Sequence, residues 1–346
     1  YPENDYVLYA PKKRENKRMN LLTGQYRQLT LAYPATSFWK KLSSLWRVWG
    51  ITSQLEKEGI ELFHGLSNEL PLNIHKSRIK SIVTIHDLIF LRYPQYYQSI
   101  DRKIYTYKFR KACENADKII AISECTKRDI IRYFNIPDDK IDVVYQGCDV
   151  SFTHPVTEEK KEEVRKKYQL PDHYILNVGS IEERKNILAA VQALPMLPQH
   201  IHIVIVGRRT GYTEKVEQFI KDNGLGERVH IISNVPFNDL PAFYQSAEIF
   251  VYPSRFEGFG IPIIEALYSG IPVVAATGSC LEEAGGPDSI YVNPDDITGL
   301  ADAFKQIYSN SDKRKNMVEK GREFAKRFSE KQQSEEIINI YKKLIR

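Results

Sequence analysis

The sequence predicts an α/β protein with two doubly wound domains, in which parallel sheets face each other across a cleft. Short β-branched runs alternate with helical stretches along the chain, as in βαβ units. These runs are apolar on both alternating faces, which suits strands covered by helices above and below. A chain of 346 residues also has room for two domains of ordinary size.

The expected elements divide the chain into two halves. In the first half we expect strands at 6–10, 60–65, 81–88, 118–123 and 141–147. In the second half we expect them at 174–180, 201–207, 228–233, 249–254, 271–276 and 290–294. Pro155 and a charged helix interrupt the alternation. The prediction is therefore an N-terminal domain over 1–150, a C-terminal domain over 151–330 and a helix over 331–346 that packs back on the N-terminal domain.

The composition indicates a globular protein, with 42% hydrophobic and 27% charged residues. No apolar run reaches the roughly 18 residues that a membrane-spanning helix needs. The four cysteines form no C-x-x-C pair, which argues against a zinc site and a disulfide framework, and a cytoplasmic location is expected. The start lacks both a secretion signal and an initial methionine, so we expect the true N-terminus to be missing.

Two glutamates lie eight positions apart in SRFEGFGIPIIEALYSG, residues 254–270. Pro262 suits the first position of a helix and Gly270 the position after its end. Glu257 is then expected in a loop and Glu265 about one turn into the helix. Carboxylates accept hydrogen bonds from sugar hydroxyls, although these two side chains are alternatively a solvated loop charge and a residue that favours the helix dipole.

The glycines between these glutamates point to an anion. Gly258 and Gly260 let the backbone approach a ligand closely, and free amides at a helix start favour phosphate. The whole stretch therefore suits a ligand with both phosphate and polyol parts.

A second stretch, VGSIEERKN at 178–186, offers positive charge. Gly179 and Ser180 follow a strand, and Arg184 and Lys185 lie where the next helix is expected to begin. Two cations oppose the dipole of a helix at its start, so a compensating anion is expected, and a diphosphate suits this need. The alternative is a solvated basic loop.

A histidine also follows a strand. His86 in TIHDL lies at the carboxyl end of the third predicted strand, where ligands bind in sheets of this kind. His86 therefore either binds a ligand or has only a structural role. Asp87 beside it could simply orient a turn.

These motifs together resemble the retaining nucleotide-sugar glycosyltransferases of family 4, which have the GT-B architecture. The resemblance rests on RK at 184–185, the E-x7-E of the 254–270 stretch, IHDL, KIIAISE and ATGSCLEEAGG. It covers nearly the whole chain.

The resemblance implies a role for each matching residue. Arg184 and Lys185 hold the donor diphosphate and stabilise the leaving group, while Glu265 binds the ribose hydroxyls. Glu257, with the amides of Gly258, Phe259 and Gly260, holds the transferred sugar, which His86 contacts from the other domain. The catalytic set is thus Arg184, Lys185, Glu257 and His86. Neither a metal nor another cofactor is expected.

Two departures from the family pattern stand out. The strand at 6–10 resembles the second strand of the family, so an opening strand and its glycine-rich loop are missing, through truncation or a real loss of part of the site. Glu282 replaces a proline that relatives often have, which leaves Glu283 as the matching residue.

The acceptor side is indicated by a tryptophan-rich stretch. All three tryptophans lie in 37–50, where Leu42, Trp46 and Trp49 are expected on one helical face beside Lys40, Lys41 and Arg47, with more basic residues at 11–18. Such a helix can lie on an anionic bilayer at the inner face of the membrane. The alternative is a helix that buries its tryptophans in the domain core.

The donor and acceptor are predicted only as classes. Base contacts are expected near Gly207 and in the loop 233–237, which includes Val235, and these residues say little about the base. Resemblance to bacterial relatives favours GDP-mannose, then a UDP-sugar, with a glycan or polyprenyl-linked acceptor. Alternative functions are a sugar-nucleotide epimerase and a catalytically silent relative. No patch with stacking platforms for nucleic acid is found outside the tryptophan stretch.

Overall fold

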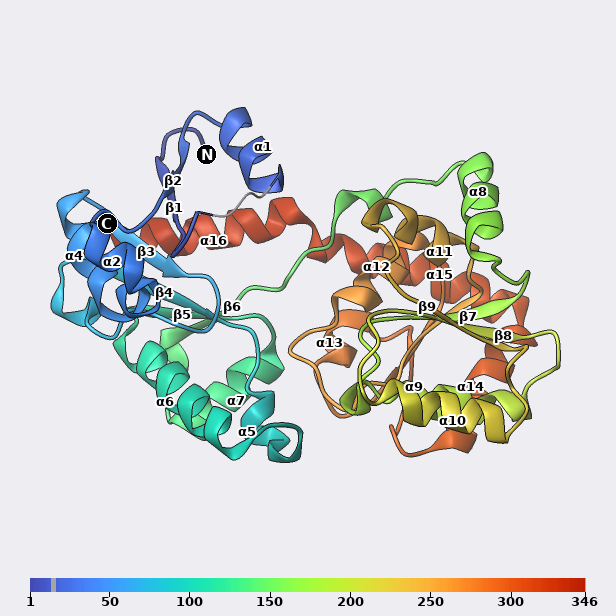
Figure 1. Ribbon diagram of the computed structural model, residues 1–346. Coiled ribbons are helices and arrows are strands. Elements are labelled where there is room, and N and C mark those ends of the chain that lie inside the picture. The colour runs from blue at the N-terminus through green and yellow to red at the C-terminus, as the bar shows by residue number, and fades with distance from the viewer. Residues whose placement is uncertain (14–16, 346) are drawn as a thin grey trace.

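The protein, described by a computed structural model over residues 1–13 and 17–345, has two α/β domains side by side (Figure 1). Within those residues there are three parallel sheets, one in the C-terminal half and two in the N-terminal half. Helices cover the sheets, so the predicted fold class is confirmed.

The C-terminal domain has a doubly wound sheet with the strand order β12-β11-β10-β7-β8-β9. Its strands are β7 (Tyr174–Val178), β8 (His202–Val206), β9 (Val229–Ile232), β10 (Ile249–Tyr252), β11 (Val273–Ala276) and β12 (Ile290–Val292). The order reverses between β7 and β10, which are neighbours in the sheet. In such sheets the ligand crevice lies at this switch point, beyond the carboxyl ends of the strands.

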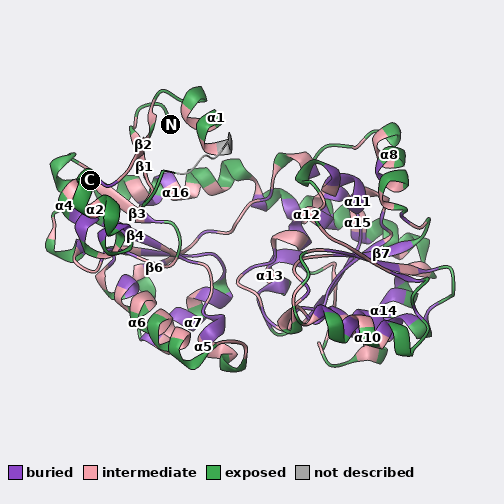
Figure 2. Ribbon diagram, in the orientation of Figure 1, coloured by how far each residue is buried: buried purple, intermediate pink, exposed green. Residues whose placement is uncertain are grey.

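Helices pack on both faces of this sheet (Figures 1 and 2). They are α8 (Glu158–Tyr168), α9 (Ile187–Ala193), α10 (Thr213–Asp222), α11 (Leu240–Ser246), α12 (Ile261–Ser269), α13 (Leu281–Gly285), α14 (Ile297–Tyr308) and α15 (Ser311–Ala325). Successive strand residues enter different cores: Leu176 packs in the cluster that includes α11 and α12, and Ile175 packs with α9 and α14. This alternation explains why the strands are apolar on both faces.

The N-terminal half contains a four-stranded and a two-stranded sheet. The strands are β1 (Tyr6–Tyr9), β2 (Leu29–Ala32), β3 (Leu62–Gly65), β4 (Lys80–Ile85), β5 (Lys118–Ala121) and β6 (Ile141–Val143). The helices are α1 (Lys17–Gln25), α2 (Ser37–Lys41), α3 (Ser43–Leu45), α4 (Ile51–Lys57), α5 (Ile89–Arg92), α6 (Ser99–Asn115) and α7 (Glu124–Phe134). Strand β2 was not predicted, because its four residues form no clear β-branched run.

A cavity of about 1760 Å³ separates the two N-terminal sheets. Residues of β1 and β3 line it, together with Trp46 and Tyr341. Among the described residues, β1 pairs only with β2, and β3 pairs only with β4. None of the predicted site residues lines this cavity.

The expected single helix over 37–50 is wrong. The backbone leaves the helical conformation at Leu42, and residues Trp46–Gly50 form a π-helix that continues into α4. Because the helical phase changes there, Trp46 is buried in the core while Trp49 is 48% exposed. The upstream basic segment 11–18 lies partly outside the described residues.

The last helix, α16 (Glu330–Ile345), packs on the N-terminal domain. His64 of β3 pairs through Nδ1 with the Tyr341 hydroxyl at 2.6 Å and through Nε2 with the Thr84 hydroxyl at 2.7 Å. Burial lowers the pKa of His64 to about 4, so the ring is neutral at neutral pH. These contacts fix α16 against the sheet.

The chain therefore passes between the domains twice, first after β6 and again between α15 and α16 (Figure 1). The two passages touch at Gly147, whose N–H donates to the Gln333 side-chain oxygen at 3.4 Å. A Cβ at this glycine would lie 3.0 Å from the Phe328 carbonyl oxygen. The passages thus lie side by side.

Candidate active site

Two glycine-containing strand ends meet beside the switch point of the C-terminal sheet. Gly179 follows β7 and Gly207 follows β8, and a Cβ at Gly207 would lie 1.8 Å from the Gly179 carbonyl oxygen. At Gly179, φ is +153°, and a Cβ there would lie 3.4 Å from Lys185 Nζ. Glycine is needed at Gly207 because the backbone of Gly179 approaches so closely, and at Gly179 because other residues rarely adopt its φ.

Arg184, Lys185 and Glu257 come together beside these strand ends. Arg184 Nη1 is 2.8 Å from one carboxylate oxygen of Glu257, and Lys185 Nζ is 3.1 Å from the other. Between 13% and 16% of each of these side chains is exposed, so the three charges are largely sheltered from water. We call these three residues the charge cluster.

Tyr252 at the end of β10 completes the charge cluster. Lys185 donates a hydrogen bond to the Tyr252 hydroxyl at 2.9 Å, and this hydroxyl donates to Glu257 at 3.2 Å. Tyr252 is 3% exposed, and burial raises its pKa well above the ordinary value. It therefore remains a neutral hydroxyl that orients both charged groups.

The electrostatics favour the ionised forms of Glu257 and Arg184. Burial acts to raise the pKa of Glu257, but Lys185 and Arg184 outweigh it and hold the pKa below the ordinary value. Burial likewise opposes ionisation of Arg184, and Glu257 overcomes this, so the pKa of the guanidinium is raised. Each charge thus depends on the others.

The predicted need for a compensating anion is met by the chain itself. Arg184 and Lys185 lie in a short 3-10 turn, Glu183–Lys185, and α9 begins only at Ile187. Glu257 reaches them from the loop after β10 and supplies the negative charge. A ligand diphosphate would have to compete with this carboxylate for the same two cations.

The loop 256–260 that carries Glu257 is held by its backbone. Arg184 donates a hydrogen bond to the Phe256 carbonyl, and the Cys280 thiol donates to the carbonyls of Glu257 at 3.0 Å and Phe259 at 2.8 Å. The Phe259 ring stacks on Tyr145 of the other domain at 5.2 Å. The position of Glu257 is therefore determined by contacts from both domains.

The helix predicted after this loop is present as α12. It begins at Ile261, one residue before Pro262, with Gly260 as the N-cap at φ +136°. It ends at Gly270 in the left-handed conformation, at φ +76°. The predicted placement of Glu265 one turn into the helix is confirmed.

Glu265 has surroundings unlike those of Glu257. The Tyr244 hydroxyl donates to it at 2.6 Å, and no contact joins it to the charge cluster among the described residues. Burial raises the pKa of Glu265, and nearby Asp149 acts in the same direction while Tyr244 opposes it. The two glutamates therefore differ in chemistry. Glu257 neutralises two cations, whereas Glu265 accepts a hydrogen bond from Tyr244 and forms no ion pair among the described residues.

His86 lies across the domain boundary against the same loop. A Cβ at Gly258 would lie 2.2 Å from the His86 carbonyl oxygen, so only glycine permits this approach. The ring Nε2 is 2.9 Å from the Leu66 carbonyl. Asp87 accepts a hydrogen bond from the Ile89 N–H at 3.0 Å, which is the turn-orienting contact suggested as an alternative.

The remaining predicted residues surround the charge cluster without contacting it directly. The Ser180 hydroxyl donates to Glu182 at 2.6 Å, and the Ser233 hydroxyl donates to the Gly207 carbonyl at 2.7 Å. Val235 is half-buried in the loop after β9. Together these residues line the carboxyl edge of the sheet from β7 to β9.

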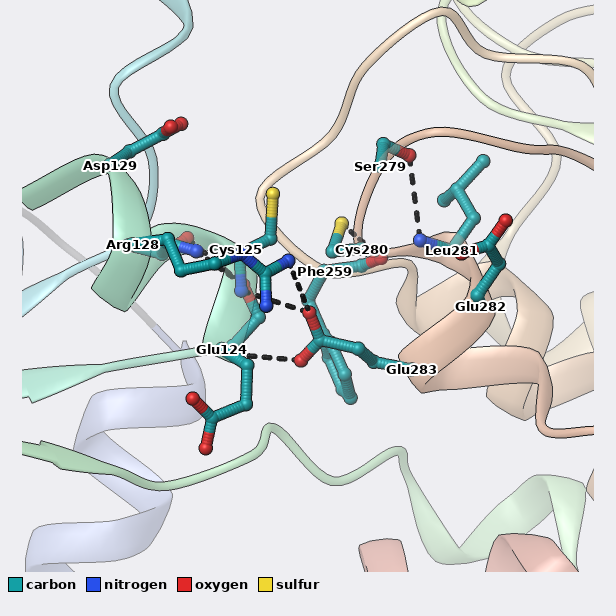
Figure 3. A network of polar contacts seen from close by, with 12 residues as sticks. Glu124, Cys125, Arg128, Asp129, Phe259, Ser279, Cys280, Leu281, Glu282 and Glu283 are labelled. Atoms are coloured by element: carbon teal, nitrogen blue, oxygen red, sulfur yellow. Dashed lines mark hydrogen bonds and ion pairs between the residues drawn. The ribbon is translucent and has the colours of Figure 1, made fainter. Parts of the chain in front are cut away.

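Sequence reasoning missed two residues of the site, Tyr252 and Tyr244. Tyr252 ends a strand, which is a signal that draws attention to it. Tyr244 on α11 acts through its contact with Glu265 on α12, and no pattern indicates such a contact. The motifs that resemble the family had already singled out Glu283 and the serine of KIIAISE, Ser123. Figure 3 shows Glu283 beside Glu124 at the start of α7.

The described residues include no group of three or more His, Cys, Asp or Glu side chains that could hold a metal ion. All four cysteines are free and buried. Across residues 1–13 and 17–345, no helix combines the length and apolar character that crossing a membrane requires.

Comparison with protein families identifies the family of this chain. Residues 5–152 match the model described as Glycosyltransferase Family 4, and residues 159–324 match Glycosyl transferases group 1. The chain therefore belongs to the family 4 and group 1 glycosyltransferases and is a glycosyltransferase.

Two relatives are mannosyltransferases by name. The chain is 31% identical over 289 residues to "O-antigen chain mannosyltransferase B" of Escherichia coli, across 82% of this chain and 74% of that protein. It is 29% identical over 225 residues to "O-antigen chain mannosyltransferase RfbU" of Salmonella typhimurium, across 65% and 60% of the two proteins.

Solved structures confirm the GT-B fold. A glycosyltransferase from Rickettsia africae aligns with a TM-score of 0.79 at 22% identity, covering 99% of this chain and 90% of that one. Anabaena Alr3699/HepE in complex with UDP and glucose aligns with a TM-score of 0.76 at 16% identity, covering 99% and 100%.

Proposed function

We propose that the protein is a retaining, metal-independent mannosyltransferase that uses GDP-mannose and a glycan or polyprenyl-linked acceptor in polysaccharide assembly. The charge cluster at the switch point carries this proposal, because it offers two largely sheltered cations where a donor diphosphate would lie. The choice of mannose rests on relatives whose names describe them as mannosyltransferases. We place the reaction in the cytoplasm, at the inner face of the membrane.

Arg184 and Lys185 bind the donor diphosphate and stabilise the negative charge that develops when the sugar leaves. A preorganised donor in a sheltered site is worth about 100- to 1000-fold in rate. Both cations are already positioned before the donor enters. They therefore perform the neutralisation that a metal ion provides in other transferases, which supports metal independence.

Glu257 changes partners when the donor binds. The incoming diphosphate takes over its two cations, and the released carboxylate turns to accept hydrogen bonds from the hydroxyls of the transferred sugar. The amides of Gly258, Phe259 and Gly260 lie in the same loop and contact that sugar, with His86 on the opposite side. Glu265 binds the ribose hydroxyls, since its carboxylate has free acceptor capacity beside Tyr244.

The same arrangement supports retention of configuration without a covalent intermediate. We assign the Glu257 carboxylate, once the diphosphate has taken over its two cations, to hydrogen bonds from sugar hydroxyls and not to a covalent bond with the sugar. Attack on the same face from which the diphosphate departs requires no carboxylate nucleophile. The carboxylate spacing rule for glycosidases accordingly does not apply to Glu257 and Glu265.

A thermal-shift panel of UDP, GDP, ADP and their sugars tests the donor. We expect GDP and GDP-mannose to raise the midpoint of unfolding, because a ligand that binds only the folded state stabilises it. A response to UDP-sugars instead would change the proposed donor from GDP-mannose to a UDP-sugar. A lack of response to every nucleotide would overturn the proposal. The base is read by the loops at Gly207 and 233–237, where Val235 lies.

A surface on the N-terminal domain suits contact with the membrane that carries a lipid-linked acceptor. Exposed apolar side chains gather on the segment 37–50: Phe38, Leu42, Leu45 and Trp49. Lys40 and Lys41 are exposed beside them. Apolar insertion combined with basic charge is what binding to an anionic bilayer requires.

Sedimentation with vesicles that contain anionic lipid tests this surface. We expect the wild type to bind at low salt and the double variant Phe38→Ala/Trp49→Ala to bind at least about 10-fold more weakly, because burial of each ring contributes a few kcal/mol. Tyr107→Ala, which removes an exposed ring from α6, is the matched control. Equal binding by both variants, or none by the wild type, would contradict the membrane role.

A further inference from the structure

A carboxylate of one domain binds the start of a helix in the other (Figure 3). Glu283 on α13 accepts hydrogen bonds from the backbone N–H groups of Glu124 at 2.7 Å and Cys125 at 2.9 Å, at the start of α7. Arg128, one turn further along α7, lies 3.8 Å from the same carboxylate. One side chain thus joins the two domains by three contacts.

The physical setting makes this contact stronger than a surface ion pair. The first amides of a helix have no partner within the helix, and its N-terminus favours negative charge. Glu283 satisfies two of these amides at once, and only 16% of its side chain is exposed. Hydrogen bonds between a carboxylate and sheltered amides are roughly twice as strong as those between neutral groups.

The same end of α7 contacts the loop that carries Glu257. Ser123, the N-cap of α7, donates a hydrogen bond through its hydroxyl to the Gly258 carbonyl at 2.7 Å. Thr126 in the first turn places its hydroxyl 3.3 Å from the His86 carbonyl. The start of α7 therefore connects His86 of one domain to Gly258 of the other.

The start of helix α13 also contacts that loop. Cys280, immediately before α13, donates from its thiol to the carbonyls of Glu257 and Phe259. The loop thus lies between α13 and α7, and Glu283 ties these two helices directly to each other. Any loss of the Glu283 contact frees α7 to move away from the loop.

We propose that Glu283 is a positioning residue that holds the domains closed and sets the loop 256–260 against His86. Its hydrogen bonds go to α7, and it acts through α7 and Ser123. This inference rests on the proposed role of that loop in holding the transferred sugar.

Glu283→Ala and Glu283→Gln test this role, with Glu282→Gln as the matched control on the exposed neighbouring residue. Small-angle scattering gives the radius of gyration with and without GDP, calorimetry gives the affinity for GDP, and turnover of GDP-mannose gives kcat and KM. Thermal unfolding of each variant shows whether it is folded.

We expect Glu283→Ala to have a larger radius of gyration and a kcat about 10- to 100-fold lower, as the loss of one charge-assisted hydrogen bond would give. Affinity for GDP should change less than about twofold, because the contacts to the diphosphate lie within one domain. Glu283→Gln keeps one acceptor oxygen and should fall between Glu283→Ala and the wild type, a gradation that a general loss of stability does not produce.

The inference would be overturned if both Glu283 variants had the same radius of gyration and the same kcat as Glu282→Gln. If the wild type binds no nucleotide, the proposed function fails, whereas the comparison of radii without ligand still decides whether Glu283 holds the domains together. If Glu283→Ala does not fold, Glu283→Gln supplies the same comparison with the shape of the side chain preserved.

Discussion

Replacing Lys185 with alanine is expected to lower the rate of sugar transfer by about 100- to 1000-fold. The Lys185 ammonium is positioned by Glu257 at 3.1 Å and by Tyr252 at 2.9 Å. A water molecule that fills the space left in the alanine variant would carry no positive charge. Charge that develops on the departing diphosphate would then lack one of its two cations. Steady-state turnover of the responding nucleotide sugar measures the loss.

The same variant should also bind the nucleoside diphosphate more weakly, and calorimetry measures this separately from turnover. Arg208→Ala is the matched control, because Arg208 carries the same charge near the same loops but its side chain is 78% exposed. An unchanged affinity in Lys185→Ala would contradict the assignment of Lys185 to the diphosphate.

Replacing Glu257 with glutamine is expected to separate binding from catalysis. The carboxylate neutralises Arg184 and Lys185 in the ligand-free protein, and a diphosphate has to displace it. Removing that negative charge therefore frees the two cations, and affinity for the nucleoside diphosphate should rise by about 10-fold, the effect of one favourable charge interaction. Transfer should nevertheless fall by at least about 100-fold, because the sugar loses its charged acceptor.

Calorimetry with the nucleoside diphosphate and turnover of its sugar, measured on the same preparation, reveal this opposite change. Glu182→Gln is the control, since Glu182 also faces Arg184, at 3.7 Å, but is more exposed. Weaker binding of the diphosphate to Glu257→Gln would show that the carboxylate positions the cations more than it competes for them.

Local patterns predicted the fold well, and several residues singled out from them lie together at the switch point. The alternation of apolar strands and helices identified all eleven strands that build the two larger sheets and β1, because burial on both faces leaves a plain signal, and it missed β2. Gly260, Gly270 and Pro262 likewise placed α12 to within one residue, since backbone conformation restricts residue choice there.

Contacts between distant segments could not be predicted in this way. The pairing of Glu257 with Arg184 and Lys185 joins residues more than seventy positions apart, and only the sheet order brings them together. The π-helix after Leu45 was missed because a uniform helical period assigns Trp46 and Trp49 to one face. A π-helix has more residues in each turn than an α-helix, so the two rings point in different directions, one into the core and the other to the surface.

The pair of passages that meet at Gly147 has a mechanical consequence. Two covalent links that lie side by side act as a joint with one axis, so the domains can swing apart but cannot drift freely. The Tyr145 and Phe328 rings lie close to this joint, with their centroids 5.5 Å apart, so we expect them to stay in contact when the domains move. Contacts between the domains that lie farther from the joint are expected to open and close in one movement, which makes admission of the donor a single coordinated event.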